Sequence, residues 1–421
     1  MTFTQDAQRL ADRGLRRVVE RTETYDTGDY PNGLTLSYRA ADSDLKPEIL
    51  VVKSIQELKE LCGMPDDIYR SGKLKNVHDV PPPPSSLDGP ITNPTDVHLC
   101  AAISCYLYGN STRVEDYAQT INELRFPLKI VVFSGKSVTV QPGHPLKVTG
   151  TDERPFGLFF DTITVESGGL IETSGPGKLA CGTLAFTSST SNVAQTGGTI
   201  IQRGGDAGNA GNGSSPGQSG PGTKGSDGTG DKHSCTKESG TGGKGRPGGP
   251  GGDASEGPRG GDAGEVNLSV DELTGTLTVG SIGGNGGNGG DGGTGGKGGP
   301  GGPGGKGHTT SDSHKNCANG PQGPGGDGGN GGNGMPGGRG GDGKNIYINW
   351  QKGNPTINVS PDKSKGGNGG NAGQGGEGGP GIPQGSGGQP GKSAPGGQGG
   401  KAGQLILNGP NGTDILTPPN A

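Results

Sequence analysis

Residues 283–306 read GGNGGNGGDGGTGGKGGPGGPGGK, about eight Gly-Gly-X triplets in a row, and similar tracts recur between residues 204 and 403. An α-helix repeats every 3.6 residues and a strand every 2, so a three-residue period without an apolar member favours an extended helix of the polyproline II type. The X positions hold Asn, Asp, Thr, Lys and Pro, which suit a face exposed to water. The repeat therefore predicts a shape and says little about an activity.

The glycines imply that several such tracts pack together. An isolated extended helix makes no internal hydrogen bonds, and glycine loses much backbone entropy on folding, so a lone tract would be disordered. Order requires that its N–H and C=O groups bond to neighbouring helices. A flexible glycine-rich linker is the alternative. Collagen is disfavoured, because glycine fills two of every three positions and proline contributes only 33 of 421 residues.

Short segments of alternating apolar and polar residues separate the tracts and predict half-buried strands. These segments are 199–202, 265–270, 276–279, 345–350, 356–359 and 404–407. Each glycine-rich block is also interrupted near its middle, at residues 231–239, 308–319 and 382–392. We therefore expect three long hairpins, each with an outgoing and a returning extended helix, that leave from the turns of a solenoid-like stack of strands.

The predicted fold class is mixed: a small α/β N-terminal region, a β-rich, solenoid-like middle, and a bundle of about six polyglycine or polyproline II helices in three hairpins with interspersed strands. With 25% hydrophobic residues, the chain holds too little apolar material for one conventional core of its size. The expected regions are 1–80 (α/β), 81–96 (Pro-rich linker), 97–128 (helical hairpin), 129–203 (β-rich), 204–403 (glycine-rich bundle with strands at 265–279 and 345–359) and 404–421 (terminal strand and tail).

Charge and hydropathy exclude several classes of partner. The formal net charge is −5, with 36 Lys and Arg against 41 Asp and Glu well mixed, so no basic stripe points to nucleic acid. No run of 18 apolar residues predicts a membrane span, and residues 1–20 are charged throughout and lack the apolar core of a signal peptide. We expect a location outside the cell or on a virion or other assembly, reached without a conventional signal peptide, with an intracellular assembly as the alternative.

The expected hairpin tips hold the best candidate site. His233 and Cys235 lie in the first interruption, and His308, His314 and Cys317 lie in the second. If the hairpins pack side by side with similar lengths, these loops meet. They would then form either a Cys235–Cys317 disulfide or a metal site, such as structural zinc, and unrelated polar loops are the third possibility. No other cofactor is expected.

The remaining candidates have ordinary structural explanations. Four further cysteines are expected to be small buried residues, and three further histidines have no partner at an informative spacing. The cysteines are Cys62, Cys100, Cys105 and Cys181, and the histidines are His78, His98 and His144. The carboxylates of the X positions, such as Asp291, are expected to be solvated. No catalytic motif is present: residues 386–393 end in GKS but lack the first glycine of a phosphate-binding loop.

The Gly-Gly-X tracts resemble those of glycine-rich polyglycine II bundle proteins, over residues 204–403 only. The alternation of tract, loop and returning tract is most similar to the receptor-binding adhesins at the tips of T-even-type phage long tail fibres. That resemblance implies that a front domain attaches to a fibre and that the loops at 231–239, 308–319 and 382–392 bind a bacterial surface receptor. Springtail antifreeze proteins share the triplet, but their flat Thr- or Ala-lined face is absent here.

Three functions follow as expectations. The first is a non-enzymatic recognition protein that binds a cell-surface or fibre partner, protein or glycan, through its tip loops. The second is a self-assembling structural protein that forms a filament, coat or array. The third and least favoured is an enzyme on the β-region. Residues 3–21, which are expected to form a helix, discriminate between the first two functions. A helix that docks within the chain favours a monomeric tip, and a helix that forms an exposed arm favours polymerisation.

Overall fold

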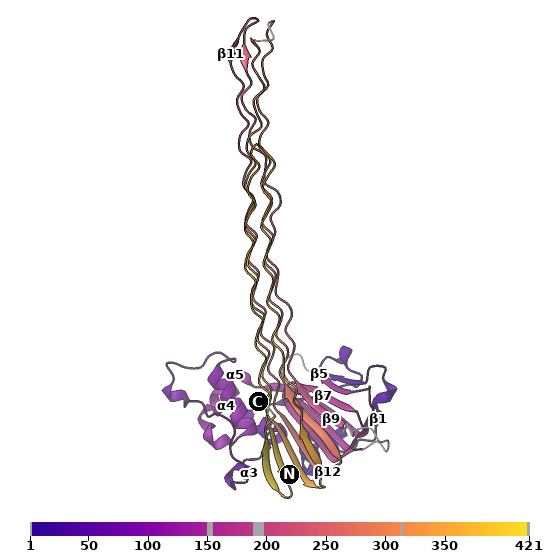
Figure 1. The fold of residues 1–421 in the computed structure, drawn as a ribbon. Coiled ribbons are helices and arrows are strands. Elements are labelled where there is room, and N and C mark those ends of the chain that lie inside the picture. Colours follow the sequence, from indigo (N-terminus) through magenta and orange to yellow (C-terminus); the bar gives the residue numbers. More distant parts are fainter. Residues whose placement is uncertain (1, 150–154, 188–197, 312–314, 419–421) are drawn as a thin grey trace.

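The computed structural model of the chain describes residues 2–149, 155–187, 198–311 and 315–418. It has two parts, a base built of β-sheets and helices and a long narrow shaft that projects from it (Figure 1). Both ends of the chain lie in the base. Within the described residues, no helix combines the length and the apolar character that crossing a membrane requires.

Among the described residues, the α-helices all precede residue 126. They are α1 (Phe3–Asp12), α2 (Ile55–Cys62), α3 (Asp66–Arg70), α4 (Val97–Tyr108) and α5 (Ala118–Arg125). The helix predicted over 3–21 ends at Asp12, because the chain reverses at Gly14, whose φ is 99°. Asp96 caps α4, because its side chain accepts hydrogen bonds from the backbone N–H groups of His98 and Leu99.

The strands form two large sheets. In the first sheet the order is β1-β4-β6-β8-β12-β14-β16-β17, with β3 on β4, and in the second it is β15-β13-β9-β7-β5-β2. The first sheet contains β1 (Thr24–Asp26), β3 (Glu48–Val52), β4 (Leu128–Val140), β6 (Phe156–Val165), β8 (Gly177–Phe186), β12 (Val266–Thr274), β14 (Ile346–Lys352), β16 (Leu405–Gly409) and β17 (Gly412–Leu416). The second contains β2 (Leu34–Ser37), β5 (Leu146–Thr149), β7 (Leu170–Ser174), β9 (Gly198–Arg203), β13 (Thr276–Ile282) and β15 (Thr356–Val359).

Successive strands alternate between the two sheets, so the chain winds in coils. From β4 to β9, and again from β12 to β15, each coil gives one strand to each sheet, and like strands pair in parallel. The strands predicted between the glycine tracts belong to this same stack, as expected. Tight turns join the sheets, and Gly275 and Gly353 occupy two of them at φ 88° and 98°. A Cβ at either would lie 2.0 Å from a carbonyl oxygen, of Phe186 and of Leu273 respectively.

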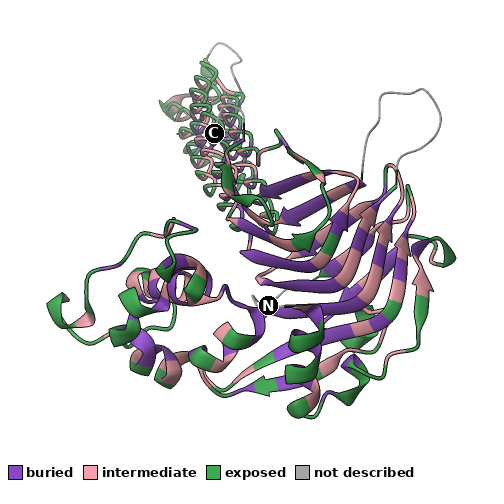
Figure 2. Ribbon diagram, turned by 90° about the horizontal axis from the view of Figure 1, so that it is seen from below, coloured by how far each residue is buried: buried purple, intermediate pink, exposed green. Residues whose placement is uncertain are grey.

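The core lies on both faces of the first sheet. Inside the coils, residues such as Val131 and Phe133 pack with the second sheet. On the outer face, Ile130, Val132 and Phe159 pack against the helices. Because strands covered on both faces bury consecutive residues, β4 is buried throughout 130–133 and β6 throughout 156–160 (Figure 2).

The shaft consists of the glycine-rich tracts, which run side by side as extended segments joined by backbone hydrogen bonds. The segments are 204–228, 240–265, 283–307, 319–345, 364–381 and 385–403. At one level of the shaft, Gly338 N donates to Gly287 O at 2.8 Å and Gly367 N donates to Gly338 O at 2.8 Å. Such bonds recur at every third residue, which satisfies backbone groups that lie in the interior.

The sheets set the register of the shaft. Thr278 pairs with Thr199 in the second sheet, and Asn285 N donates to Asp206 Oδ1 with the same offset of 79 residues. The offset is still 79 near the tip, where Lys306 N donates to Asp227 Oδ1. Because each hairpin leaves from the same corner of successive coils, stacking of the coils aligns the tracts triplet by triplet.

Side chains of the X positions complete the bonding. Asn288 Oδ1 accepts from Asn368 N at 2.8 Å, and Asp291 Oδ1 accepts from Asn371 N at 2.7 Å. The same contact occurs along other pairs of segments, for example from Ser386 N to Asp327 Oδ1 at 3.0 Å. Asp291 is exposed, as expected, and its carboxylate also accepts the N–H of an X residue on the adjacent segment.

The fold class predicted from the sequence is wrong. It gave about half of the chain to a bundle of polyglycine or polyproline II helices, whereas the structure is mostly parallel β-sheet with few helices. In the glycine-rich segments that the structure describes, no residue is assigned to a helix. The physical reason is that the strands carry the apolar side chains that build a core, while the glycine segments are joined mainly by hydrogen bonds of their backbones and of X-position side chains.

Candidate functional site: the disulfide-linked tip

The distal end of the shaft brings together the interruptions of the first two hairpins. The first forms a small antiparallel pair, β10 (Thr229–Gly230) and β11 (Cys235–Lys237). Asp231 shapes the turn between them, because its Oδ1 accepts hydrogen bonds from the N–H groups of His233 and Ser234, both at 2.7 Å. These bonds lower the pKa of the Asp231 carboxyl.

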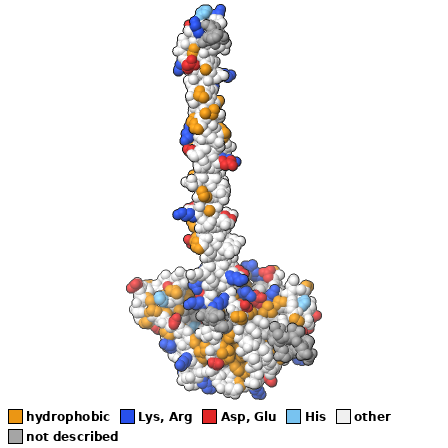
Figure 3. All heavy atoms as spheres, in the orientation of Figure 1, with side chains coloured by type: hydrophobic (Ala, Val, Ile, Leu, Met, Phe, Trp, Pro, Cys, Tyr) orange, Lys and Arg blue, Asp and Glu red, His pale blue; other side chains and the backbone are white. Residues whose placement is uncertain are grey.

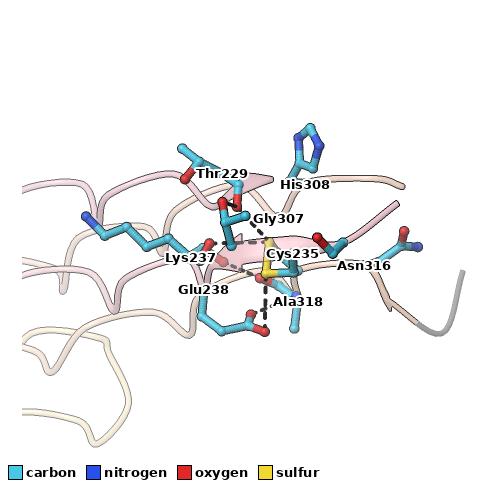
Figure 4. Close-up of a disulfide and its surroundings, with 12 residues drawn as sticks. Thr229, Cys235, Lys237, Glu238, Gly307, His308, Asn316 and Ala318 are labelled. Atoms are coloured by element: carbon cyan, nitrogen blue, oxygen red, sulfur yellow. Dashed lines mark hydrogen bonds between the residues drawn. A yellow bond between two sulfur atoms is a disulfide. The ribbon is translucent and has the colours of Figure 1, made fainter. Parts of the chain in front are cut away.

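A disulfide joins Cys235 to Cys317, which are 82 residues apart in the chain (Figure 4). Cys317 is 4% exposed, and its N–H donates to His308 O at 2.8 Å. Of the alternatives that the sequence left open, the structure therefore contains the covalent bridge. It cross-links two hairpins that are otherwise held by hydrogen bonds and by ion pairs such as Lys244–Asp327.

Hydrogen bonds tie the two loops together on both sides of the disulfide. Ser311 N donates to Lys232 O at 2.8 Å, and Ala318 N donates to Glu238 Oε2 at 3.1 Å. Ser239 Oγ donates to Ala318 O. The two loops thus form one cross-linked unit.

The residues predicted to bind a metal are only partly brought together. Cys235, Cys317 and Glu238 have potential ligand atoms within 4.8 Å of one another. His308 Nε2 instead faces Asp231 O at 3.3 Å, and His233 Nδ1 lies 3.4 Å from Ser311 Oγ. Bridged sulfurs are not thiolates, so a metal site stays a prediction for the reduced protein. His314 lies outside the described residues.

Glu238 is a tip residue that the sequence analysis missed. Its Oε1 lies 3.5 Å from Cys235 Sγ. The available signal was its spacing of three residues from Cys235, but that spacing alone does not show that the carboxylate faces the bridge.

The third hairpin does not reach this site. Its returning segment is offset from that of the second hairpin by 59 residues, as in the bond from Lys401 N to Asp342 Oδ1. It turns near Pro383, whose carbonyl oxygen accepts from Gly325 N at 2.9 Å. Gln389 N donates to Asn330 Oδ1 within the shaft. The interruption at 382–392 is therefore mainly shaft, and not a tip loop.

A second group of ionisable residues, which the sequence analysis did not predict, is buried where the shaft meets the base. His78 Nε2 lies 2.6 Å from Tyr347 Oη and 3.4 Å from Glu265 Oε1. Tyr108 Oη donates to the backbone oxygen of Glu265 at 3.0 Å, and its ring stacks on that of Tyr347. Burial raises the pKa of Glu265 to about 8 and lowers the pKa of His78 to about 4. These buried contacts connect the root of the shaft to the helices.

This group predicts a pH dependence of stability. An unperturbed glutamate has a pKa of 4.5. Because the folded state raises the pKa of Glu265, the proton on Glu265 stabilises the folded protein below pH 4.5. This contribution to the free energy of unfolding is lost as pH rises to about 8. Protonation of His78 matters only below 6.5, the pKa of an unperturbed histidine. Between pH 6.5 and 8, wild type should therefore lose about 2 kcal/mol of unfolding free energy that Glu265→Gln does not lose. Denaturant titrations at several pH values measure this, with Glu256→Gln in the exposed shaft as control. A variant with the wild-type slope would contradict the assignment.

The other cysteines follow the expectation with one exception. Cys62, Cys105 and Cys181 are buried, but Cys100 is exposed. The thiol of Cys100 lies at the helical side of the base, far from the tip in the chain and in the fold. It offers a position for labelling the base without touching the tip.

Comparisons with known proteins place the chain in no family. No family model matches it, and no curated protein matches it. A springtail antifreeze protein from Granisotoma rainieri, described as a nine polyproline type II helical bundle, is 27% identical over 41% of this chain and 94% of its own. The TM-score is 0.07, so this weak and partial likeness carries no argument. Nothing found in these comparisons supports the more specific resemblance to phage tail-fibre adhesins.

Proposed function

We propose that this protein is a non-enzymatic recognition protein in which the shaft holds the disulfide-linked tip away from the base to bind a surface. The observation that carries the proposal is the position of the Cys235–Cys317 bridge, at the end of the shaft farthest from the base. A cross-link there orders the two loops before any partner arrives. Pre-ordered loops bind with a smaller loss of conformational entropy.

The location of the polar loops supports the same function. Loops held by a rigid scaffold are common positions for binding residues. The tip loops expose hydroxyl, amide, imidazole and ammonium groups, as at Thr309, Asn316, His233 and Lys232. These groups can recognise a protein or a glycan on a cell or fibre.

The arrangement of the base argues against the alternative, a polymer. Residues 3–12 form α1, which docks within the chain: Phe3 and Leu10 are buried, and Lys178 Nζ lies 2.6 Å from Asp6 Oδ2. The last coil of the first sheet pairs with the antiparallel strand β17, which ends the parallel stacking that the coils of another copy would continue. Both features favour a monomeric tip.

Binding of labelled protein to cells tests the proposal. Full-length protein carrying a fluorophore on Cys100 is applied to a panel of bacterial cells and glycan arrays. We expect a surface whose binding drops at least about tenfold in Lys232→Ala/His233→Ala/Thr309→Ala, since each lost polar contact is worth about 0.5–1.5 kcal/mol. Lys46→Ala/Lys53→Ala, which changes exposed residues of the base, should bind as wild type. Binding that the tip substitutions leave unchanged, or ordered polymers in electron micrographs at neutral pH, would contradict the proposal.

A further inference from the structure

The described part of the tip presents cations outward while its carboxylates are held in local contacts. Lys232, Lys237 and Lys306 are exposed and have no ion-pair partner among the residues that the structure describes. Figure 3 shows basic and His side chains at the distal end of the shaft, with Asp and Glu side chains just below them. In Figure 4 the Lys237 side chain and the His308 ring point away from the disulfide.

The nearby carboxylates, Asp227, Asp231 and Glu238, are exposed as well, but each is engaged in contacts within the tip. Asp231 Oδ1 accepts hydrogen bonds from two backbone N–H groups of its own turn, and Glu238 Oε2 accepts one from Ala318 N. Asp227 pairs with Lys224 at 2.5 Å and also accepts from Lys306 N at 2.7 Å. The ionisable groups of the described tip without such contacts are therefore mainly the ammonium groups of these lysines, on a chain whose formal net charge is −5.

The tip lacks the groups used for other kinds of ligand. Residues 229–319 contain no Phe, Tyr or Trp, so bases cannot stack there as they do in single-stranded nucleic acid sites. The large apolar side chains that are exposed, such as Ile49, Val97 and Ile382, lie elsewhere in the described structure. Insertion into a lipid surface uses exposed apolar residues, so a membrane is also disfavoured.

We infer that the tip binds an anionic polysaccharide, through ammonium contacts to its acidic groups and hydrogen bonds from hydroxyl and amide groups to the sugar. This inference rests on the proposed function and adds the chemical class of the partner. Thr309, Asn316 and Asn319 add an exposed hydroxyl and exposed amide groups to the same end of the shaft. The disulfide fixes the spacing of lysines that come from two hairpins, Lys237 beside Cys235 and Lys306 on the segment that leads to Cys317.

The test measures binding of the full-length protein to dextran sulfate, with neutral dextran of the same length as comparison. We expect binding only to the sulfated polymer, weakening as salt is raised, because exposed charges are screened. Lys232→Gln/Lys237→Gln/Lys306→Gln should bind about tenfold or more weakly, since an exposed charge contact is worth a factor of roughly two to five. Lys46→Gln/Lys53→Gln/Lys129→Gln removes the same charge from the base and should bind as wild type.

Other results would overturn the inference. Equal binding to neutral dextran, equal weakening by the two triple variants, or preferential binding to anionic vesicles or single-stranded DNA would each contradict it. The cell-binding experiment separates this failure from failure of the proposed function. If the Lys→Gln tip variant still binds cells through the tip, the anionic partner is wrong but recognition by the tip stands. If no tip substitution affects any binding, both are wrong.

Discussion

Replacing Gly290 by alanine should destabilise the shaft by about 3 kcal/mol or more, because the core of the shaft has no space for a side chain. A Cβ at Gly290 would lie 2.1 Å from the backbone oxygen of Gly211 and 3.0 Å from the Cβ of Ala254. Neither the carbonyl nor the segment that carries it can move without breaking bonds to its neighbours. We expect rapid amide hydrogen exchange around the substitution and a lower unfolding temperature.

The other side of the same contact provides the control. A Cβ added at Gly211 would have no other atom within 4 Å, so Gly211→Ala should leave stability within about 0.5 kcal/mol or raise it slightly. The two variants have the same change in composition and helix propensity, and they differ only in packing. Equal hydrogen exchange in both variants would mean that the segments are not packed backbone to backbone.

Removing the disulfide should have the second large effect. Cys235→Ser/Cys317→Ser should lower stability by about 2–4 kcal/mol, because the bridge closes a long loop of the unfolded chain across 82 residues. The loss should be concentrated at the tip, which extends beyond the turn of the third hairpin and has fewer neighbouring segments. Hydrogen exchange by mass spectrometry would show faster exchange in residues 229–239 and 307–311, with little change in the sheets.

Cys100→Ser is the matched control, since it removes an exposed thiol that forms no bridge. Reduction of the wild-type protein should reproduce the effect of the double substitution. If the reduced and oxidised proteins have the same denaturation midpoint and the same exchange at the tip, the bridge does not order the loops. Zinc that restored slow exchange only in the reduced protein would support the metal site that the histidines and cysteines predicted.

Local patterns were enough to predict several elements. The strands between the glycine tracts, such as β9, β12 and β13, follow from the alternation of apolar and polar residues. The Cys235–Cys317 pairing could be anticipated as one alternative, because both residues interrupt glycine tracts of similar length. The length of the third hairpin was misjudged, because a triplet pattern does not show where the chain reverses.

The buried group at the root of the shaft could not be predicted in the same way. His78 and Glu265 are 187 residues apart and come together only because the helices cover the outer face of the first sheet. No periodicity in the sequence records such a contact. The acceptor role of Asp291 was missed for the same reason, since its donor Asn371 lies 80 residues away on another segment.

The sequence alone determined that two columns of glycine leave room for close approach of backbones. It also determined that apolar and polar residues alternate in the strands between the tracts. Both are properties of consecutive residues, since a missing side chain and a period of two or three are local. The tertiary structure decided which segments are neighbours and at what register. Parallel coils stack through apolar side chains that are distant in the chain. Neighbouring segments of the shaft pair at the same offsets as the coils, which are 79, 80 and 59 residues. The tip is assembled by this stacking, because hydrogen bonds between equivalent triplets are nearly identical and cannot select a register by themselves.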